Sequence, residues 1–183
     1  QSKKPGQLFR LFAFAFRTSS LKLDQFKESH SEEVEFWEFL QFEFFRQWTK
    51  LKKYASDKDV KIIGDIPIYV AYDSADVWSN SALFQLDTDK APICVAGCPP
   101  DGFSKKGQLW GNPVYDWEKM KKNGYAWWQN RIDKALTYFD IVRIDHFRGF
   151  DRFYAVASDA ENAKNGTWMQ GPSSELFRGR EDY

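Results

Sequence analysis

The residues best suited to chemistry follow a short apolar run in the segment FDIVRIDHFRGF, at positions 139–150. The run is typical of a strand that changes from apolar to ionic at its C-terminal end. With a period of two, Arg143 and Asp145 share one face, and His146 lies on the other face with the apolar residues. Barrels of the α/β class build their sites at the C-terminal ends of strands. We therefore predict that Arg143 and Asp145 point together into a barrel mouth.

A carboxylate beside an arginine suits the cleavage of a glycosidic bond. That reaction needs one carboxylate to attack or support the anomeric carbon and one carboxylic acid to protonate the leaving oxygen. Arg143 would lower the pKa of Asp145, keep it ionised and orient it for attack. The alternative is a buried Arg–Asp pair that only satisfies its own charges. The residues by themselves leave both interpretations open.

A second acid stands in the same relation to an earlier apolar run. Asp65 lies in VKIIGDIPIYV, residues 60–70, which is strand-like but interrupted by Gly64 and Pro67. A helical pattern precedes this segment, and another precedes the strand at 139–145. Helix followed by strand, repeated, is the order of a parallel α/β fold. The sequence thus predicts two acids at one rim of a sheet.

Two helices are predicted to position these strands. The first begins near Ser31 as its cap, with acids in its first turn and lysines near its end, which complement the helix dipole. Its apolar residues recur every three or four positions, and we expect this stripe to pack on a sheet. The stripe consists of Trp37, Leu40, Phe44, Trp48 and Leu51. The second helix covers 115–138, with Gly124 as a possible break.

The segment 72–113 is too long and irregular for a simple connection, and such segments are usually functional or form a subdomain. In a barrel it would lie over the site. Its candidate ligand-facing residues are Trp78, Phe103, Trp110 and Asn112. A structural role for any one of these is an equal alternative. Further along, the polar insert SDAENAKNGT predicts an irregular segment with a flexible tip.

Composition points to a folded protein with a neutral partner. The 183 residues are 43% hydrophobic, and 26 basic residues balance 26 acidic ones. A net charge of zero gives no electrostatic footprint for nucleic acid or an anionic membrane. The chain has 8 Trp, 8 Tyr and 17 Phe. Most of these rings are expected in a core, although flat apolar rings also suit a carbohydrate ligand.

Cysteine and histidine are too few for an ordinary structural zinc site. The only such residues are Cys94, Cys98, His30 and His146, and no glycine-rich phosphate loop occurs. Two thiols without a secretory signal favour free cysteines in a reducing cytoplasm. The longest apolar run falls well below the roughly 20 residues that a membrane helix needs. We expect no metal and no membrane span.

The size of the chain predicts a part of a larger protein. An eight-stranded α/β barrel takes about 250 residues, whereas this chain has 183 and begins with Gln1. Residues 1–30 receive no assignment, because their apolar cluster fits a strand or a short helix equally. Residues 178–183 are likewise unassigned. The oligomeric state is not predictable from the sequence.

Four segments together carry a family resemblance. They are GDIPIYVAYDSADVW (64–78), VAGCPPDGFS (95–104), GQLWGNP (107–113) and VRIDHFRGF (142–150). In this order and at these intervals they closely resemble the amylomaltases, the 4-α-glucanotransferases of glycoside hydrolase family 77. The resemblance covers roughly residues 32–177. Each piece alone is modest, but the combination is highly specific.

The resemblance implies both fold and catalytic residues. Residues 31–177 would form part of a catalytic (β/α)8 TIM barrel, with 72–113 as a loop or subdomain insertion over the site. Asp145 matches the family's catalytic nucleophile, and Arg143 matches the arginine that accompanies it. The implied reaction is a retaining transfer of α-1,4-glucan segments between maltodextrins through a covalent glucosyl-enzyme. It needs no metal or organic cofactor.

The resemblance also implies a substrate groove. Asp65 matches an acid near the first sugar subsite, and Trp110 matches an aromatic residue that lines the donor and acceptor groove. The other expected substrate contacts are Phe103, Asn112 and His146. The expected partner is an α-1,4-glucan or maltodextrin.

The chain departs from the family in two places. Gly102 stands where the family typically has a tyrosine, which removes a ring from a loop along bound glucan and makes that loop more mobile. The family's acid/base glutamate, in an A-E-D-L-G segment, is not found in this chain, and neither Glu175 nor Glu181 stands in such a motif. We therefore predict negligible activity for the 183 residues alone. The alternatives are an α-glucan hydrolase and a non-catalytic glucan-binding or structural fragment.

Overall fold

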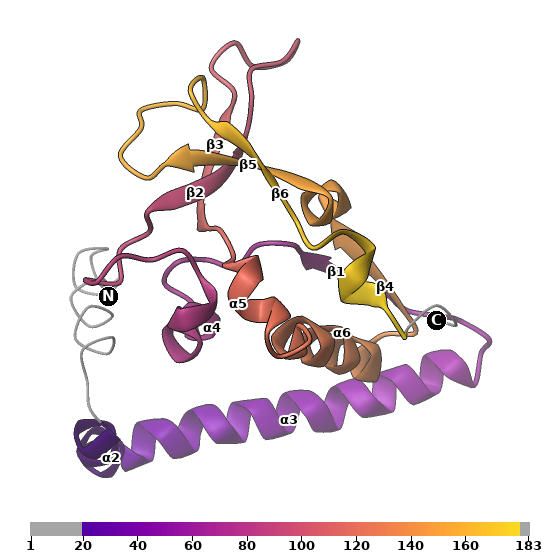
Figure 1. Cartoon of the computed structure of the whole chain (residues 1–183). Coiled ribbons are helices and arrows are strands. Elements are labelled where there is room, and N and C mark those ends of the chain that lie inside the picture. The colour runs from indigo at the N-terminus through magenta and orange to yellow at the C-terminus, as the bar shows by residue number, and fades with distance from the viewer. Residues whose placement is uncertain (1–19, 180–183) are drawn as a thin grey trace. The chain divides into compact units, whose positions relative to one another are not determined.

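The computed structural model describes residues 20–179 (Figure 1). These residues divide into two compact units, of which unit 1 comprises 20–64 and 134–143 and unit 2 comprises 65–133 and 144–179. Most of the N-terminal segment 1–30 and most of the C-terminal end 178–183, for which the sequence supports no assignment, lie outside the described residues. The described part has a mixed α/β fold.

Unit 1 is dominated by one long helix. Helix α2 covers Ser20–Ser29 and α3 covers Ser31–Ser56. The predicted charge pattern is present, since α3 has Glu32 and Glu33 in its first turn and Lys53 in its last. The predicted cap is wrong by one residue, because His30 occupies the N-cap position without a side-chain cap. Ser31 is instead the first helical residue.

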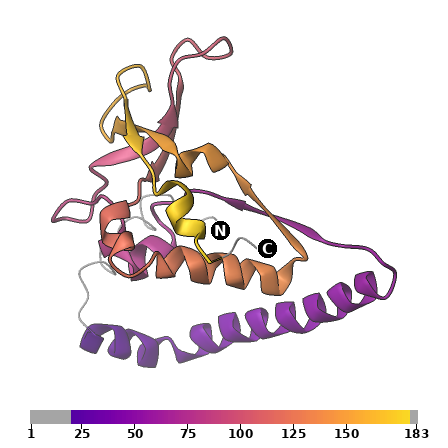
Figure 2. The ribbon, with the colours of Figure 1, turned by 45° about the vertical axis from the view of Figure 1, so that its right-hand side comes forward.

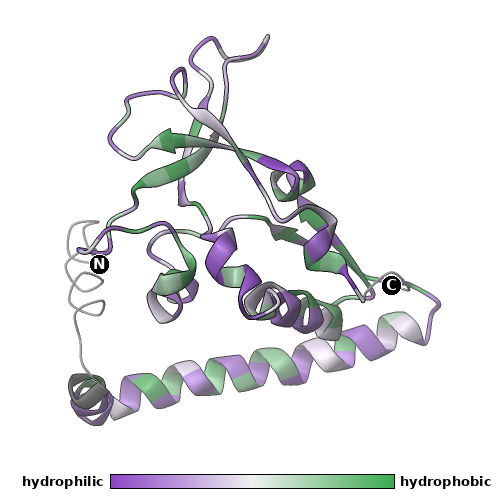
Figure 3. Ribbon diagram, in the orientation of Figure 1, coloured by the Kyte–Doolittle hydropathy of each residue, from purple (hydrophilic) through white to green (hydrophobic). Residues whose placement is uncertain are grey.

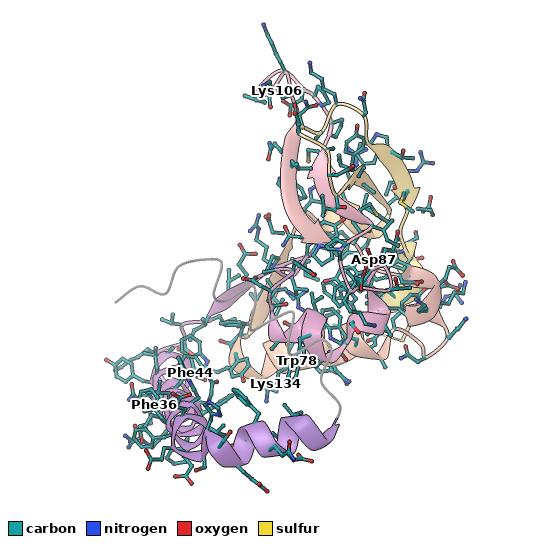
Figure 4. All side chains as sticks on the ribbon, turned by 90° about the vertical axis from the view of Figure 1, so that its left-hand side faces the viewer. Phe36, Phe44, Trp78, Asp87, Lys106 and Lys134 are labelled. Atoms are coloured by element: carbon teal, nitrogen blue, oxygen red, sulfur yellow. The ribbon has the colours of Figure 1, made fainter. Side chains whose placement is uncertain are left out.

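The apolar stripe of α3 does not pack on a sheet as expected. No residue of α3 is buried, and Trp37 and Phe44 are 63% and 52% exposed. Apolar and polar positions alternate along the helix in Figure 3, and Figure 4 shows Phe36 and Phe44 on it. Its C-terminal half is anchored to another segment of unit 1, as Trp48 Nε1 donates to the Tyr138 carbonyl at 2.9 Å. The apolar periodicity predicted the helix but not whether another surface covers its apolar stripe.

Strands β1 (Ile63–Pro67) and β4 (Ile141–Asp145) pair in a two-stranded sheet. The amides of Asp140 and Ile141 donate to the Ile62 carbonyl at 2.9 and 3.3 Å, so both strands begin at the same end. Figure 2 shows them starting together and running in one direction. The predicted parallel relation of the two acid-bearing strands is therefore confirmed.

The predicted second helix is two helices. Helix α5 covers Trp117–Lys121 and α6 covers Ala126–Tyr138. Gly124 and Tyr125 between them have positive φ angles of 65° and 58°. A left-handed pair cannot continue a right-handed helix, so the break anticipated at Gly124 is present.

Unit 2 contains a four-stranded antiparallel sheet in the order β3-β2-β5-β6. Its strands are β2 (Cys94–Cys98), β3 (Gln108–Pro113), β5 (Arg152–Ala157) and β6 (Thr167–Gln170). The polar insert that was predicted to be irregular forms the loop at 158–166. The residues on either side of it, which the sequence did not assign to an element, form β5 and β6. The long segment 72–113 likewise supplies β2 and β3.

Short helical turns and an aromatic core complete unit 2. The turns are α4 (Ala75–Ser79), η1 (Ser81–Leu83), η2 (Phe147–Phe150) and η3 (Ser173–Phe177). Large side chains that are almost fully buried include Trp128, Tyr115, Phe84, Phe150 and Phe153. Among residues 20–179, no helix has the length and apolar content needed to cross a membrane. Cys94 and Cys98 are free and partly buried, as predicted.

Candidate active site

Strand β4 presents two charged residues on one face. Exposure alternates along it, with Arg143 and Asp145 exposed and Val142 and Ile144 half-buried. This is the alternation predicted from the sequence. An exposed carboxylate two residues from a guanidinium, at the last position of a strand, remains able to meet a ligand.

His146 ends the strand rather than extending it. Its φ of 52° and ψ of 41° are left-handed, and η2 follows directly. The expectation that His146 continues the face of Val142 and Ile144 is therefore wrong, because that alternation holds only while the chain stays extended. Burial lowers the pKa of His146, opposed by Asp145 and reinforced by Arg148. The imidazole is thus biased towards its neutral form.

Asp65 is exposed in the middle of β1. It lies one residue after Gly64, where an added Cβ would meet the Phe139 ring at 1.9 Å. Only glycine lets Phe139 lie so close to the start of β1. This packing explains locally why Gly64 precedes the acid.

Trp110, in β3, contacts two other rings. Its indole centroid is 6.2 Å from that of Tyr69 and 4.9 Å from that of His146. Its Nε1 donates to Gln108 Oε1 at 3.1 Å. Of the predicted site residues, Trp110 and His146 are in contact, and His146 is the residue next to Asp145. Three segments of unit 2 therefore meet at one indole.

Asn112 and Phe103, which were predicted to contact the ligand, differ from Trp110 and His146 in their surroundings. Asn112 uses its side-chain amide to donate to the Val70 carbonyl at 2.9 Å, so part of its hydrogen-bonding capacity holds the backbone. The Phe103 side chain is fully exposed on the loop between β2 and β3, whose tip Lys106 marks in Figure 4. It therefore contacts neither Trp110 nor His146. Trp78, on α4, is half-buried.

The Phe103 loop has its own local order. Asp101 Oδ1 accepts from the amides of Phe103 and Ser104 at 2.9 and 2.7 Å. The hydroxyl of Ser104 donates to the Gly107 carbonyl at 2.7 Å. Gly102 faces open space, since a Cβ added there would have no heavy atom within 4 Å. A larger side chain at position 102 is therefore sterically free.

Sequence reasoning missed Tyr69. It is 7% exposed and lies five residues after Gly64 in the segment that follows β1. Burial raises its pKa well above the usual range, so it acts as a neutral ring. The run Ile68-Tyr69-Val70 was interpreted only as the end of a strand, and no spacing signal linked it to Trp110. The contact between Tyr69 and Trp110 is visible only in the three-dimensional structure.

Glu175, which does not stand in an acid/base motif, is engaged elsewhere. It accepts from the Tyr125 hydroxyl at 2.9 Å and forms an ion pair with Lys121 at 3.0 Å. The hydrogen bonds from Lys121 and Tyr125 lower the pKa of Glu175. A carboxyl held ionised in this way is a poor proton donor.

A separate cavity of about 550 Å³ lies in unit 1, between α3 and the end of α6. Its walls include Phe45, Trp48, Lys52, Lys134 and Tyr138. Lys134 Nζ lies 5.4 Å from the Phe45 ring centroid and 5.5 Å from that of Tyr138. None of the predicted site residues lines this cavity. The candidate site residues therefore lie in the middle of β1, at the end of β4 and on β3.

The chain belongs to glycoside hydrolase family 77. Its residues 11–181 match the model of that family, which is described as 4-alpha-glucanotransferase. A 4-alpha-glucanotransferase from Clostridium butyricum is 51% identical over 157 residues, which cover 85% of this chain and 32% of that protein. Its counterpart from Aquifex aeolicus is 52% identical over 140 residues, which cover 76% of this chain and 29% of that protein.

A solved structure agrees with these sequence relatives. The amylomaltase from Streptococcus agalactiae, in complex with acarbose, has a TM-score of 0.86 and 43% identity, and the match covers 88% of this chain and 33% of that one. The family resemblance found in the sequence is thereby confirmed. The chain spans about a third of the length of the relatives that it matches.

Proposed function

We propose that the chain supplies the nucleophile-bearing part of a retaining 4-α-glucanotransferase. The observation that carries the proposal is the exposed pair Arg143 and Asp145 at the end of β4, followed directly by a histidine in contact with Trp110. Family membership supports it. In this proposal residues 31–177 form part of a (β/α)8 barrel. The segment 72–113 belongs to an insertion over the site.

The reaction has two steps. In the first, a carboxylate oxygen of Asp145 attacks the anomeric carbon of a donor α-1,4-glucan, and the glycosidic carbon–oxygen bond breaks. The departing 4-oxygen takes a proton from an acid that we do not assign within these residues. In the second, the 4-hydroxyl of an acceptor glucan attacks the same carbon, releases Asp145 and gives up its proton to the conjugate base. The anomeric configuration is retained because each of the two displacements inverts it.

Other residues have supporting roles. Arg143 orients Asp145 for attack. Trp110 offers a ring face to a sugar, and Asp65 is a hydrogen-bond acceptor for sugar hydroxyls. A water-poor site favours the acceptor hydroxyl over water. We also propose a reducing compartment such as the cytoplasm, which the two free cysteines support.

A chimera tests the proposal in a full-length setting. Residues 31–177 replace the matching segment of the Clostridium butyricum relative, and the product is incubated with maltotriose. We expect glucose and longer maltodextrins with no change in reducing ends, and Asp145→Asn should lower the rate by about three orders of magnitude or more. Asp159→Asn, on the exposed loop after β5, is the matched control and should leave the rate unchanged.

Each other outcome has a definite meaning. A rise in reducing ends would indicate hydrolysis, and full activity of Asp145→Asn would leave only a binding or structural role. The 183-residue chain alone should yield no glucose from maltotriose, because one carboxylate cannot serve as both nucleophile and acid. Glucose and longer maltodextrins from that chain would refute this last expectation.

A further inference from the structure

The indole of Trp110 is held by groups from three separate segments. The His146 ring meets it edge to face, with centroids 4.9 Å apart and planes at 88°. The Tyr69 ring is tilted by 49° to the indole at a centroid distance of 6.2 Å, and Gln108 Oε1 accepts a hydrogen bond from the indole N–H at 3.1 Å. Aromatic rings in such contacts attract each other more strongly than their buried area alone would give. The hydrogen bond to Gln108 restricts rotation of the indole in the plane of its ring. The indole therefore has few orientations open to it.

The histidine is itself locked by its backbone. Its φ of 52° is left-handed, and its carbonyl accepts from the Gly149 amide at 2.9 Å. A methyl group on Gly149 would meet Ile68 Cδ1 at 2.7 Å, and both His146 Cδ2 and the Tyr69 hydroxyl at 3.4 Å. The turn after Asp145 is thus packed closely against the segment that holds Tyr69. His146 cannot move away without reopening this turn.

Tyr69 is held by hydrogen bonds to the backbone carbonyls on either side of it. The carbonyl before it, on Ile68, accepts from the Tyr115 hydroxyl at 2.6 Å. The carbonyl after it, on Val70, accepts from Asn112 at 2.9 Å. Its ring also stacks on that of Tyr115, with centroids 5.9 Å apart and planes at 21°. The donors come from β3 and the residues just after it, so the strand that carries Trp110 also fixes its neighbour.

We propose that His146 is a positioning residue that acts through Trp110. It sets the orientation of the indole, and hence of the ring face offered to a sugar, by the shape of its own ring. Proton transfer and hydrogen bonding to substrate are not its role. The inference that the positioned ligand is an α-glucan rests on the proposed function, whereas the positioning itself does not.

The first test needs only the 183-residue chain. The protein is labelled with 5-fluorotryptophan, and Trp110→Phe identifies the Trp110 line in the ¹⁹F spectrum. His146→Asn tolerates the left-handed backbone but has no ring, whereas His146→Phe keeps a ring but has no nitrogen. We expect Asn to shift or broaden the Trp110 line and Phe to restore it. Restoration by Asn but not by Phe would overturn the proposal.

A second ring in contact with the indole, that of Tyr69, provides a test if a His146 variant does not fold. Thermal unfolding is recorded for each protein, since Phe is strained at a left-handed position. If His146→Phe does not fold, Tyr69→Leu and Tyr69→Phe replace it. Leu should move the Trp110 line and Phe should not, because only Phe keeps the ring. An unmoved line in both His146→Asn and Tyr69→Leu would show that the rings do not hold the indole.

The second test separates the two proposals in the active chimera. A residue that positions a sugar platform should raise KM for maltotriose by about 3- to 10-fold and leave kcat nearly unchanged when replaced by Asn. His146→Phe should restore KM. A fall in kcat with unchanged KM would show that His146 acts in the chemical step. If the variants shift the Trp110 line without any effect on KM, His146 positions Trp110 but Trp110 does not bind the glucan.

Discussion

Two aromatic-rich regions of this protein differ in what their rings contact. In unit 1, α3 has no buried residue, and Tyr54 and Trp37 are 64% and 63% exposed. In unit 2, Tyr115 and Trp128 are completely buried, and each contacts rings from other segments. Similar side chains thus have opposite surroundings. Aromatic content sets how much a segment is able to bury, and long-range contacts decide how much it does bury.

The largest expected effect comes from exchanging one tryptophan in each region. Trp128 packs edge to face on Phe150 at 4.9 Å and under the Arg131 guanidinium at 4.7 Å. Trp128→Ala should therefore lower the free energy of unfolding by about 3–5 kcal/mol. Trp37→Ala on α3 should change it by about 0.5 kcal/mol or less. Urea unfolding followed by circular dichroism measures both.

A conservative variant of Trp128 extends the comparison with Trp37. Trp128 Nε1 is buried without a hydrogen-bond partner among residues 20–179. Trp128→Phe keeps a ring and removes this unsatisfied donor, so it should cost much less than Ala, about 1.5 kcal/mol or less. Equal losses for Trp128→Ala and Trp37→Ala would show that exposure does not separate the two regions.

Two glycines extend the comparison to the backbone. In unit 1, a Cβ on Gly64 would lie 1.9 Å from Phe139 Cδ2, whereas Gly102 in unit 2 has open space around it. Gly64→Ala should therefore lower the free energy of unfolding by about 1–3 kcal/mol. Gly102→Ala should stay within about 0.5 kcal/mol. A loss at Gly102 as large as that at Gly64 would contradict the described packing.

These contrasts show what the sequence was able to predict. Strand β4 was predictable because its apolar residues alternate with Arg143 and Asp145, and β1 because Asp65 follows an apolar run. The helix from Ser31 was predictable from its three- and four-residue spacing. Periodicity is a local property, however, and it carries no information about which surface covers a stripe. The exposure of Trp37 was therefore missed.

The site was predictable to the same extent. The order of the four motifs predicts that Asp145, Arg143 and Trp110 act at one site, and this grouping stays a prediction. The structure adds that Trp110 contacts His146, the residue after Asp145. The contact of Tyr69 with Trp110 was not predictable, because the carbonyls on either side of Tyr69 accept hydrogen bonds from Tyr115 and Asn112, more than 40 residues away. Hydrogen bonds of that kind have no signal in local spacing.

Removal of the Tyr115 hydroxyl should have a smaller effect on the free energy of unfolding. The Tyr115 hydroxyl donates to the Ile68 carbonyl at 2.6 Å, and burial raises its pKa well above the usual range. Tyr115→Phe should cost about 1 kcal/mol, since the Ile68 carbonyl keeps a 3.3 Å contact with Arg131 Nη1. Tyr54→Phe, on the exposed face of α3, should cost nothing measurable. A neutral Tyr115→Phe in urea unfolding would show that the bond adds no net stability.

The smallest effect concerns pH and Glu175. Hydrogen bonds from Lys121 and Tyr125 hold the pKa of Glu175 below its ordinary value, and burial, with Glu175, raises that of Tyr125 to about 12. A lowered folded-state pKa gives stability that is present above the unfolded-state pKa and is lost as pH falls through the folded-state value. The melting temperature should therefore fall as pH is lowered from about 5 to about 3, and less steeply in Glu175→Gln. Glu161→Gln, on the exposed loop after β5, is the matched control and should keep the original slope. If Glu175→Gln keeps that slope as well, the carboxylate does not stabilise η3, and its exclusion as a proton donor loses its physical basis.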